Sequence, residues 1–229
     1  AKGTASMSSA STAAMSPPFP AERGLDVYNK KLGMWVFLAS EVMFFAALIG
    51  SYVVLRFGAP GDWARPGVVL NIKITAFNTF LLICSSVSMV KAFAAIADGD
   101  PGKMRIWLLV TIIGGACFVG IQVFEYTHLV ERGFLPSGVR DGSELADMVA
   151  KGQLPAATMG LYGSTFFTMT GFHGFHVTCG VVSMAYLFLT KALPGKYTPE
   201  DYAGIETVGL YWHFVDLVWI ILFTIVYLV

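Results

Sequence analysis

Five long apolar runs dominate this chain and limit what it can fold into. Each run reaches the length of about 20 residues that an α-helix needs to cross the hydrocarbon core of a bilayer. Backbone groups find no water to bond in lipid, so apolar runs of this length fold as helices. The sequence therefore predicts an all-α integral membrane protein, a bundle of five transmembrane helices over about residues 32–57, 72–97, 104–130, 157–190 and 205–229.

The composition agrees with a membrane protein and excludes several other classes. Only 13% of the 229 residues are charged, whereas about 25% are charged in soluble domains. The formal net charge is zero, which gives no basis for a nucleic acid partner. The three cysteines form no Cys-x-x-Cys motif, so neither a disulfide framework nor a cysteine metal site is predicted.

The first 30 residues differ from the rest of the chain. Residues 1–20 are rich in Ala, Ser, Met and Pro, a composition that cannot bury enough apolar surface to order itself. We therefore predict a flexible N-terminal tail over 1–30, followed by a five-helix domain over 31–229.

The distribution of basic residues predicts the orientation in the membrane. Nine of the 15 Lys and Arg residues lie on the side of the N-terminus and six on the other, which predicts a cytoplasmic N-terminus and an outer C-terminus.

Glu41 lies at membrane depth in the first run. It follows Lys31 by ten residues, or roughly 15 Å along a helix. An isolated carboxylate there costs several kcal/mol, so the side chain is either protonated or bonded to a buried partner. Two roles are open: a titratable, carbodiimide-reactive carboxyl, or a structural hydrogen bond across a helix interface.

Two pairs of polar residues share a helix face because they are three residues apart. Glu125 and His128 end the third run and are expected to pair with each other at the membrane interface, as a structural anchor more than a catalytic group. His213 and Asp216 lie in the last run, where a carboxylate must face protein. This helix is therefore expected to pack against other protein within the membrane.

His173 and His176 have the same spacing in the fourth run. Two histidines on one face could ligate haem or a metal, but glycines at 171, 174 and 180 are more typical of tight helix packing in membranes.

Arg56, at the outer end of the first run, is a candidate for binding a lipid phosphate, by simple snorkelling or in a specific groove. The tryptophans are interpreted as interface belts and lipid-facing bulk, notably Trp35, Trp107, Trp212 and Trp219.

Four motifs in order resemble subunit III of the haem–copper oxidases. They are LGMWVFLASEVMFFAALIGSYVVLRFG, GIQVFEYTHL, YGSTFFTMTGFHGFHVTCGVV and YWHFVDLVWIILFTIVYLV. The resemblance implies a bundle with a phospholipid-holding cleft and no haem, copper, other metal or catalytic residue of its own. It also implies that Glu41 matches the carbodiimide-reactive carboxyl, Glu125 the carboxylate at a helix end, and His213 and Asp216 the Trp-His-Phe-Val-Asp motif.

The resemblance further implies a place in a respiratory complex of the bacterial plasma membrane. The chain is similar to the short bacterial form, which lacks the first two helices of the long form. Such a subunit docks on subunit I, which reduces oxygen and pumps protons, and it supports proton uptake and stability. Subunit II, a small subunit IV and a supercomplex are further expected partners, with haem and copper on the partner subunits.

Several alternatives stay open. The Phe-His-Gly-Phe-His wording favours a cytochrome c oxidase over a quinol oxidase, and an accessory protein of a nitric oxide reductase is a closer relative of the same family. In another class, Glu41 and Asp216 would carry protons through a coupled transporter, although no internal repeat typical of transporters is present. An enzyme that ligates haem through His173 and His176 is the third possibility.

Overall fold

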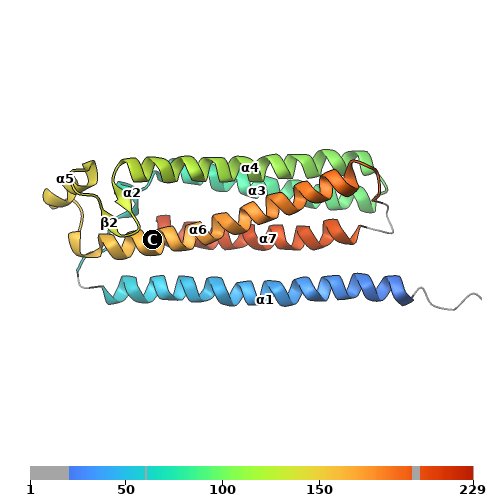
Figure 1. Cartoon of the computed structure of the whole chain (residues 1–229), viewed down its shortest axis with the longest axis horizontal. Coiled ribbons are helices and arrows are strands. Elements are labelled where there is room, and N and C mark those ends of the chain that lie inside the picture. The colour runs from blue at the N-terminus through green and yellow to red at the C-terminus, as the bar shows by residue number, and fades with distance from the viewer. Residues whose placement is uncertain (1–20, 60, 198–201, 229) are drawn as a thin grey trace, which may run out of the picture.

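Five long helices lie side by side in the computed structural model, which describes residues 21–59, 61–197 and 202–228. The chain runs up and down the bundle, so the start of the first helix and the C-terminus lie at opposite ends (Figure 1). The elements are α1 Ala21–Gly58, α2 Pro66–Val69, α3 Ile72–Ala97, α4 Pro101–Glu131, β1 Phe134–Leu135, β2 Gly138–Val139, α5 Glu144–Ala150, α6 Ala156–Leu187 with a π-turn Phe188–Ala192, and α7 Ala203–Phe223 with a π-turn Thr224–Leu228.

The predicted fold class is confirmed. Within the described residues, five helices are long and apolar enough to cross a membrane: Lys31–Gly58, Ile72–Ala97, Pro101–Glu131, Ala156–Ala192 and Ala203–Leu228. The boundary predicted at residue 30 differs, because α1 already begins at Ala21. The first 20 residues of the predicted tail lie outside the described residues.

Polar caps fix where two of the helices begin. The Asn71 side chain accepts a hydrogen bond from the backbone N–H of Ile74 at 3.4 Å, at the start of α3. Asp100 accepts one from the N–H of Lys103 at 3.0 Å, directly before Pro101 at the first position of α4. Such caps satisfy backbone donors that the first turn of a helix leaves unpaired.

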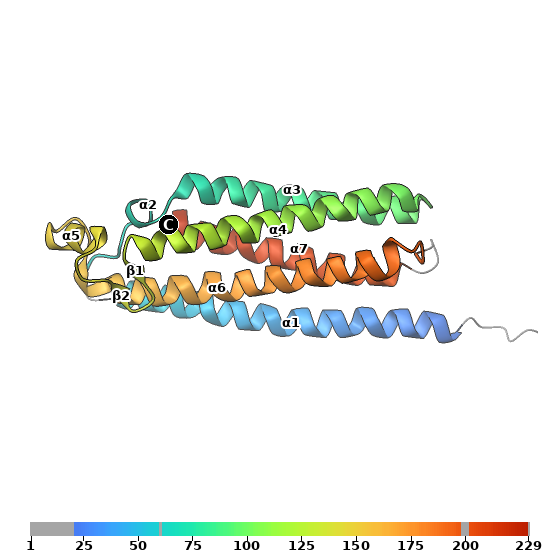
Figure 2. The same ribbon diagram turned by 45° about the horizontal axis from the view of Figure 1, so that its top comes forward.

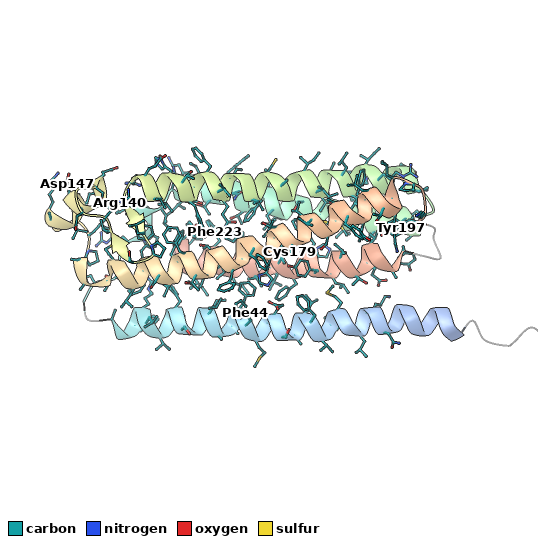
Figure 3. The ribbon with its side chains drawn as sticks, viewed as in Figure 1. Phe44, Arg140, Asp147, Cys179, Tyr197 and Phe223 are labelled. Atoms are coloured by element: carbon teal, nitrogen blue, oxygen red, sulfur yellow. The ribbon has the colours of Figure 1, made fainter. Side chains whose placement is uncertain are left out.

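Helix α1 is the outermost of the five. It packs only against α6 and α7 among the long helices with substantial contact, whereas α3 packs against α4 and α7. Figures 1 and 2 show α1 along one side of the bundle, with α3 and α4 on the opposite side. Phe44 points from α1 toward the other helices (Figure 3). Polar groups on the inner side of α1 can therefore meet groups on α6 and α7.

A small cap covers the end of the bundle where α4 leads into α6. Strands β1 and β2 pair antiparallel, and α5 follows them; Arg140 and Asp147 lie in this cap (Figure 3). Arg132 bonds the carboxylate of Glu144 through Nε at 3.2 Å and Nη2 at 3.3 Å. This guanidinium lowers the pKa of Glu144. Neither the hairpin nor α5 was predicted from the sequence.

Tryptophans of α7 form the centre of the bundle. Trp212 and Trp219 are 0% and 1% exposed, so the interpretation of these two as lipid-facing is wrong. Their indole N–H groups donate to Ser85 at 3.1 Å and Thr79 at 2.9 Å, both on α3. A buried indole needs such an acceptor. Trp35, in contrast, is 58% exposed.

Candidate functional site

Glu41 meets His176 between α1 and α6. Glu41 Oε2 lies 3.0 Å from His176 Nε2, and the two side chains are 16% and 13% exposed, respectively. The Phe45 ring lies beside the imidazole, with a centroid separation of 5.2 Å. The hydroxyl of Tyr211 on α7 donates to the backbone carbonyl of His176 at 2.8 Å. The membrane-depth carboxyl expected to need a partner therefore has one, on the neighbouring helix.

The second ring nitrogen of His176 fixes the position of one proton of this pair. Nδ1 is 2.7 Å from the carbonyl oxygen of Phe172, and a carbonyl only accepts, so Nδ1 carries a hydrogen. The contact between Nε2 and Oε2 then needs one further proton, which resides either on Glu41 as a carboxylic acid or on His176 as an imidazolium. Both forms have zero net charge, which limits the cost of placing the pair in the membrane.

His173 lies in a different environment, although it shares a helix face with His176. Its side chain is 0% exposed and stacks on Trp219 with a centroid distance of 4.7 Å. Neither ring nitrogen has a hydrogen-bond partner among the described residues. With His176 engaged by Glu41, the two histidines form no ready ligand pair, and the described residues contain no group of three or more His, Cys, Asp or Glu that could hold a metal.

The glycines beside these histidines allow close helix packing. A Cβ atom placed on Gly174 would lie 2.7 Å from Oε1 of Gln122 on α4, and one on Gly180 would lie 2.9 Å from the ring of Trp212. Real Cβ atoms essentially never come this close to another heavy atom, so only glycine fits at these two positions without a shift. The packing role predicted for this run is confirmed at these two positions; a Cβ on Gly171 would meet nothing closer than 3.9 Å.

A serine on the neighbouring helix lies beside both His213 and Asp216. Ser86 Oγ lies 2.7 Å from His213 Nδ1, and the same side chain is close to the Asp216 carboxyl. Asp216 is 8% exposed. The expectation that this carboxylate faces protein is met within the chain itself, by α3.

Glu125 and His128 do not pair with each other. Thr75 on α3 donates to Glu125 Oε1 at 2.8 Å, while the His128 ring stacks parallel to Phe124 at 6.4 Å. The two residues share a face as predicted, but the predicted pairing is wrong, because a hydroxyl of the next helix reaches the carboxyl. Glu125 is 7% exposed and lies in the interface between α3 and α4.

Arg56 lies near the outer end of α1 and bonds within the chain. Its Nη1 donates to the hydroxyl of Tyr52 at 3.2 Å. The Tyr52 ring packs edge-on against Trp63 at 5.8 Å. This contact orients the guanidinium; its predicted role at a lipid phosphate stays a prediction.

The buried polar partners on α3 and α4 were not singled out from the sequence. Their signal is visible in hindsight, because those on α3 lie on one buried face that recurs at helical spacing and is interrupted only by the apolar Leu82. The partners are Thr75, Asn78, Thr79, Ser85 and Ser86 on α3 and Gln122 on α4. Hydroxyl and amide side chains on one face of a membrane helix mark its contact with another helix.

A groove opens between α1 and α7, next to the Glu41–His176 pair. It has a volume of about 660 Å³ and is lined mainly by apolar side chains, including Trp35, Val42, Met43 and Leu217. His213 is its titratable lining residue. The groove is large and apolar enough for part of a lipid acyl chain.

Comparisons with known proteins identify the family of this chain. The family model for cytochrome c oxidase subunit III matches residues 19–132 and 154–229. The probable cytochrome c oxidase subunit 3 of Nocardia farcinica is 35% identical over 198 residues, which cover 86% of this chain and 87% of that protein. The subunit 3 of Bacillus subtilis is 34% identical over 221 residues, covering 95% and 94%. The subunit 3 of Thermostichus vulcanus is 34% identical over 197 residues, covering 86% of each. The chain therefore belongs to the cytochrome c oxidase subunit III family.

Proposed function

We propose that this chain is the accessory, non-redox subunit III of a proton-pumping aerobic terminal oxidase, of the type that oxidises cytochrome c. The observation that carries this proposal is the Glu41–His176 pair, a carboxyl and an imidazole at membrane depth that share one proton and have no net charge. The names of the relatives support the cytochrome c type over a quinol oxidase. In this role the chain is one subunit of a larger complex, with haem and copper on its partners.

The pair supports proton uptake by its protonation chemistry. Moving the bridging proton between Glu41 and His176 keeps the pair neutral, whereas losing or gaining a proton creates a charge in the membrane. A group with this property on the flank of subunit I would couple to proton uptake there.

Docking would use the exposed side of the outer helix. Val36, Met43 and Val54 of α1 are 64%, 73% and 71% exposed, so this helix presents a broad apolar surface to subunit I or to lipid. Subunit II, a small subunit IV and a supercomplex are further partners of the assembled enzyme. We place the complex in the bacterial plasma membrane, with the N-terminus in the cytoplasm and the C-terminus outside.

Phospholipid would occupy the groove between α1 and α7. Its lining is mainly apolar, as expected for acyl chains, and Arg56 near the outer end of α1 is the candidate for a headgroup. An apolar lining with cationic groups at the membrane surface is typical of lipid binding. The lipid would then support the stability of the contact with subunit I.

The transporter alternative receives no support from the polar networks. Glu41 pairs with His176 on α6, while Asp216 lies close to Ser86 on α3. The two carboxyls therefore have different partner helices.

The experiment uses the assembled enzyme with Glu41→Gln, and Asp216→Asn as the matched variant of another buried carboxyl. Glu41→Gln is expected to assemble, to lose carbodiimide labelling at position 41 and to slow proton uptake or shorten the active lifetime during turnover. Asp216→Asn should keep the labelling. If Glu41→Gln turns over and takes up protons as the unmodified enzyme does, the proposed role of the pair is wrong.

A further inference from the structure

A second crevice lies far from the groove beside α1, at the end of the bundle that carries the hairpin. It has a volume of about 560 Å³, between the start of α3 and the end of α4. Three basic side chains line it: Lys73, His128 and Arg132. Lys73 and His128 are exposed. No ion pair involves Lys73 in the described part of the chain.

The basic side chains are held in place by neighbouring groups. Arg132 donates three of its N–H groups, two to the Glu144 carboxylate and one to the Val69 carbonyl at 3.2 Å. A guanidinium has five N–H donors, so two are left for a ligand. The His128 ring is stacked on Phe124. A partly used guanidinium and a stacked imidazole offer donors in fixed directions.

The crevice also has an apolar side that continues into the membrane. Phe124 lines it and is 61% exposed, and Phe77 on the adjacent turns of α3 is 60% exposed. Free phosphate would use only the basic rim, whereas a lipid would use the rim for its headgroup and these rings for its chains. The carboxyl of Glu125 also lines the crevice, but it already accepts from Thr75.

We infer that the crevice between α3 and α4 binds the phosphate headgroup of an anionic phospholipid. Lys73, His128 and Arg132 contact the phosphate, and the acyl chains lie along Phe77 and Phe124. This site is separate from the groove between α1 and α7 and does not depend on the role of Glu41. The inference of a lipid site holds even if the chain has another role in its complex.

The experiment measures lipid binding to the purified, delipidated complex. The probe is a photoactivatable phosphatidylglycerol in nanodiscs, with phosphatidylcholine as the zwitterionic control, and cross-linked peptides are identified by mass spectrometry. Phosphatidylglycerol should label the peptides that contain residues 67–74 and 124–132. Labelling with phosphatidylcholine at equal strength would overturn the inference.

Substitutions distinguish lipid binding in the crevice from a general effect of positive surface charge. Lys73→Gln should weaken phosphatidylglycerol binding about fivefold, since one lysine contributes on that order at an anionic lipid, and Lys73→Gln with His128→Gln should weaken it further. Lys151→Gln, an exposed lysine at the end of α5 outside the crevice, should leave binding unchanged. Equal losses for Lys73→Gln and Lys151→Gln, or displacement of the lipid by inorganic phosphate at equal concentration, would contradict a lipid site.

Discussion

Glu41 and His176 join the outermost helix to the bundle through a 3.0 Å contact between Oε2 and Nε2. A second polar link, between Lys31 and Glu206 at 2.7 Å, joins the other half of α1 to α7. Most of the remaining contact of α1 is apolar. Since lipid can replace apolar contacts but not these two, the polar links decide how firmly α1 is held.

A double-mutant cycle tests the first link. Glu41→Gln and His176→Gln should each destabilise the protein against denaturation in mixed micelles, and the two effects should be non-additive. The expected coupling is about 0.5–3 kcal/mol, the range for residues in one hydrogen-bonded pair. Lys31→Gln, in the separate link, should add independently to Glu41→Gln. Additive effects of Glu41→Gln and His176→Gln would mean that the pair contributes no stability.

Ser86→Ala should uncouple His213 from Asp216. The substitution removes the hydroxyl that contacts His213 and lies close to Asp216, and a buried polar group left without a partner costs about 1–3 kcal/mol. Thermal unfolding of the purified protein measures the loss. Ser40→Ala is the control, because the Ser40 hydroxyl only bonds the Phe37 carbonyl of its own helix, on an exposed side. A smaller loss for Ser86→Ala than for Ser40→Ala would argue against this role of Ser86.

Gly174→Ala should disturb the contact between α6 and α4. The added methyl would meet the Gln122 amide at 2.7 Å, and overpacking of this kind costs about 1–3 kcal/mol. Gly120→Ala on α4 is the control, since nothing lies within 4 Å of its Cβ position and alanine favours a helix by about 1 kcal/mol over glycine. Unfolding should therefore shift in opposite directions for the two variants.

The sequence could predict the spans because hydropathy and length decide them locally. It could also predict that Glu41 and Asp216 need partners, because burial of a carboxylate is costly wherever the chain places it. It could not predict which partner, since His176 and Ser86 reach these groups only through the packing of other helices. The same limit explains Glu125: its predicted partner was His128, three residues along the same helix, but its carboxyl accepts a hydrogen bond from Thr75 on the neighbouring helix.

Boundaries and small elements were harder to predict. Helix α1 already covers the residues from Ala21 to Lys30, which the polar composition of 1–30 did not indicate. The hairpin has only two residues in each strand, too few for an alternating pattern. Ser143, whose hydroxyl accepts from the N–H of Ala146 at 3.2 Å, was the available signal for α5.

The Arg132–Glu144 pair should make the order of α5 depend on pH. Arg132 lowers the pKa of Glu144 from its ordinary value of 4.5, so the pair stabilises the cap at pH above 4.5, and this contribution is lost as the pH falls through the lowered pKa. Hydrogen exchange of the α5 amides measures it. Glu144→Gln should exchange faster than the unmodified chain at neutral pH, and the difference should vanish in acid. A difference that grows as the pH falls would contradict the pairing.

Gentle detergent purification of this chain from its native membrane, with the haem and copper content of each separated subunit, tests the central claim most directly. We expect the chain to co-purify with an oxygen-reducing partner and a copper-bearing partner, and every Soret band and copper atom to belong to them. A Soret band or stoichiometric metal on the separated chain, or its isolation as a stable, redox-active monomer, would contradict the account.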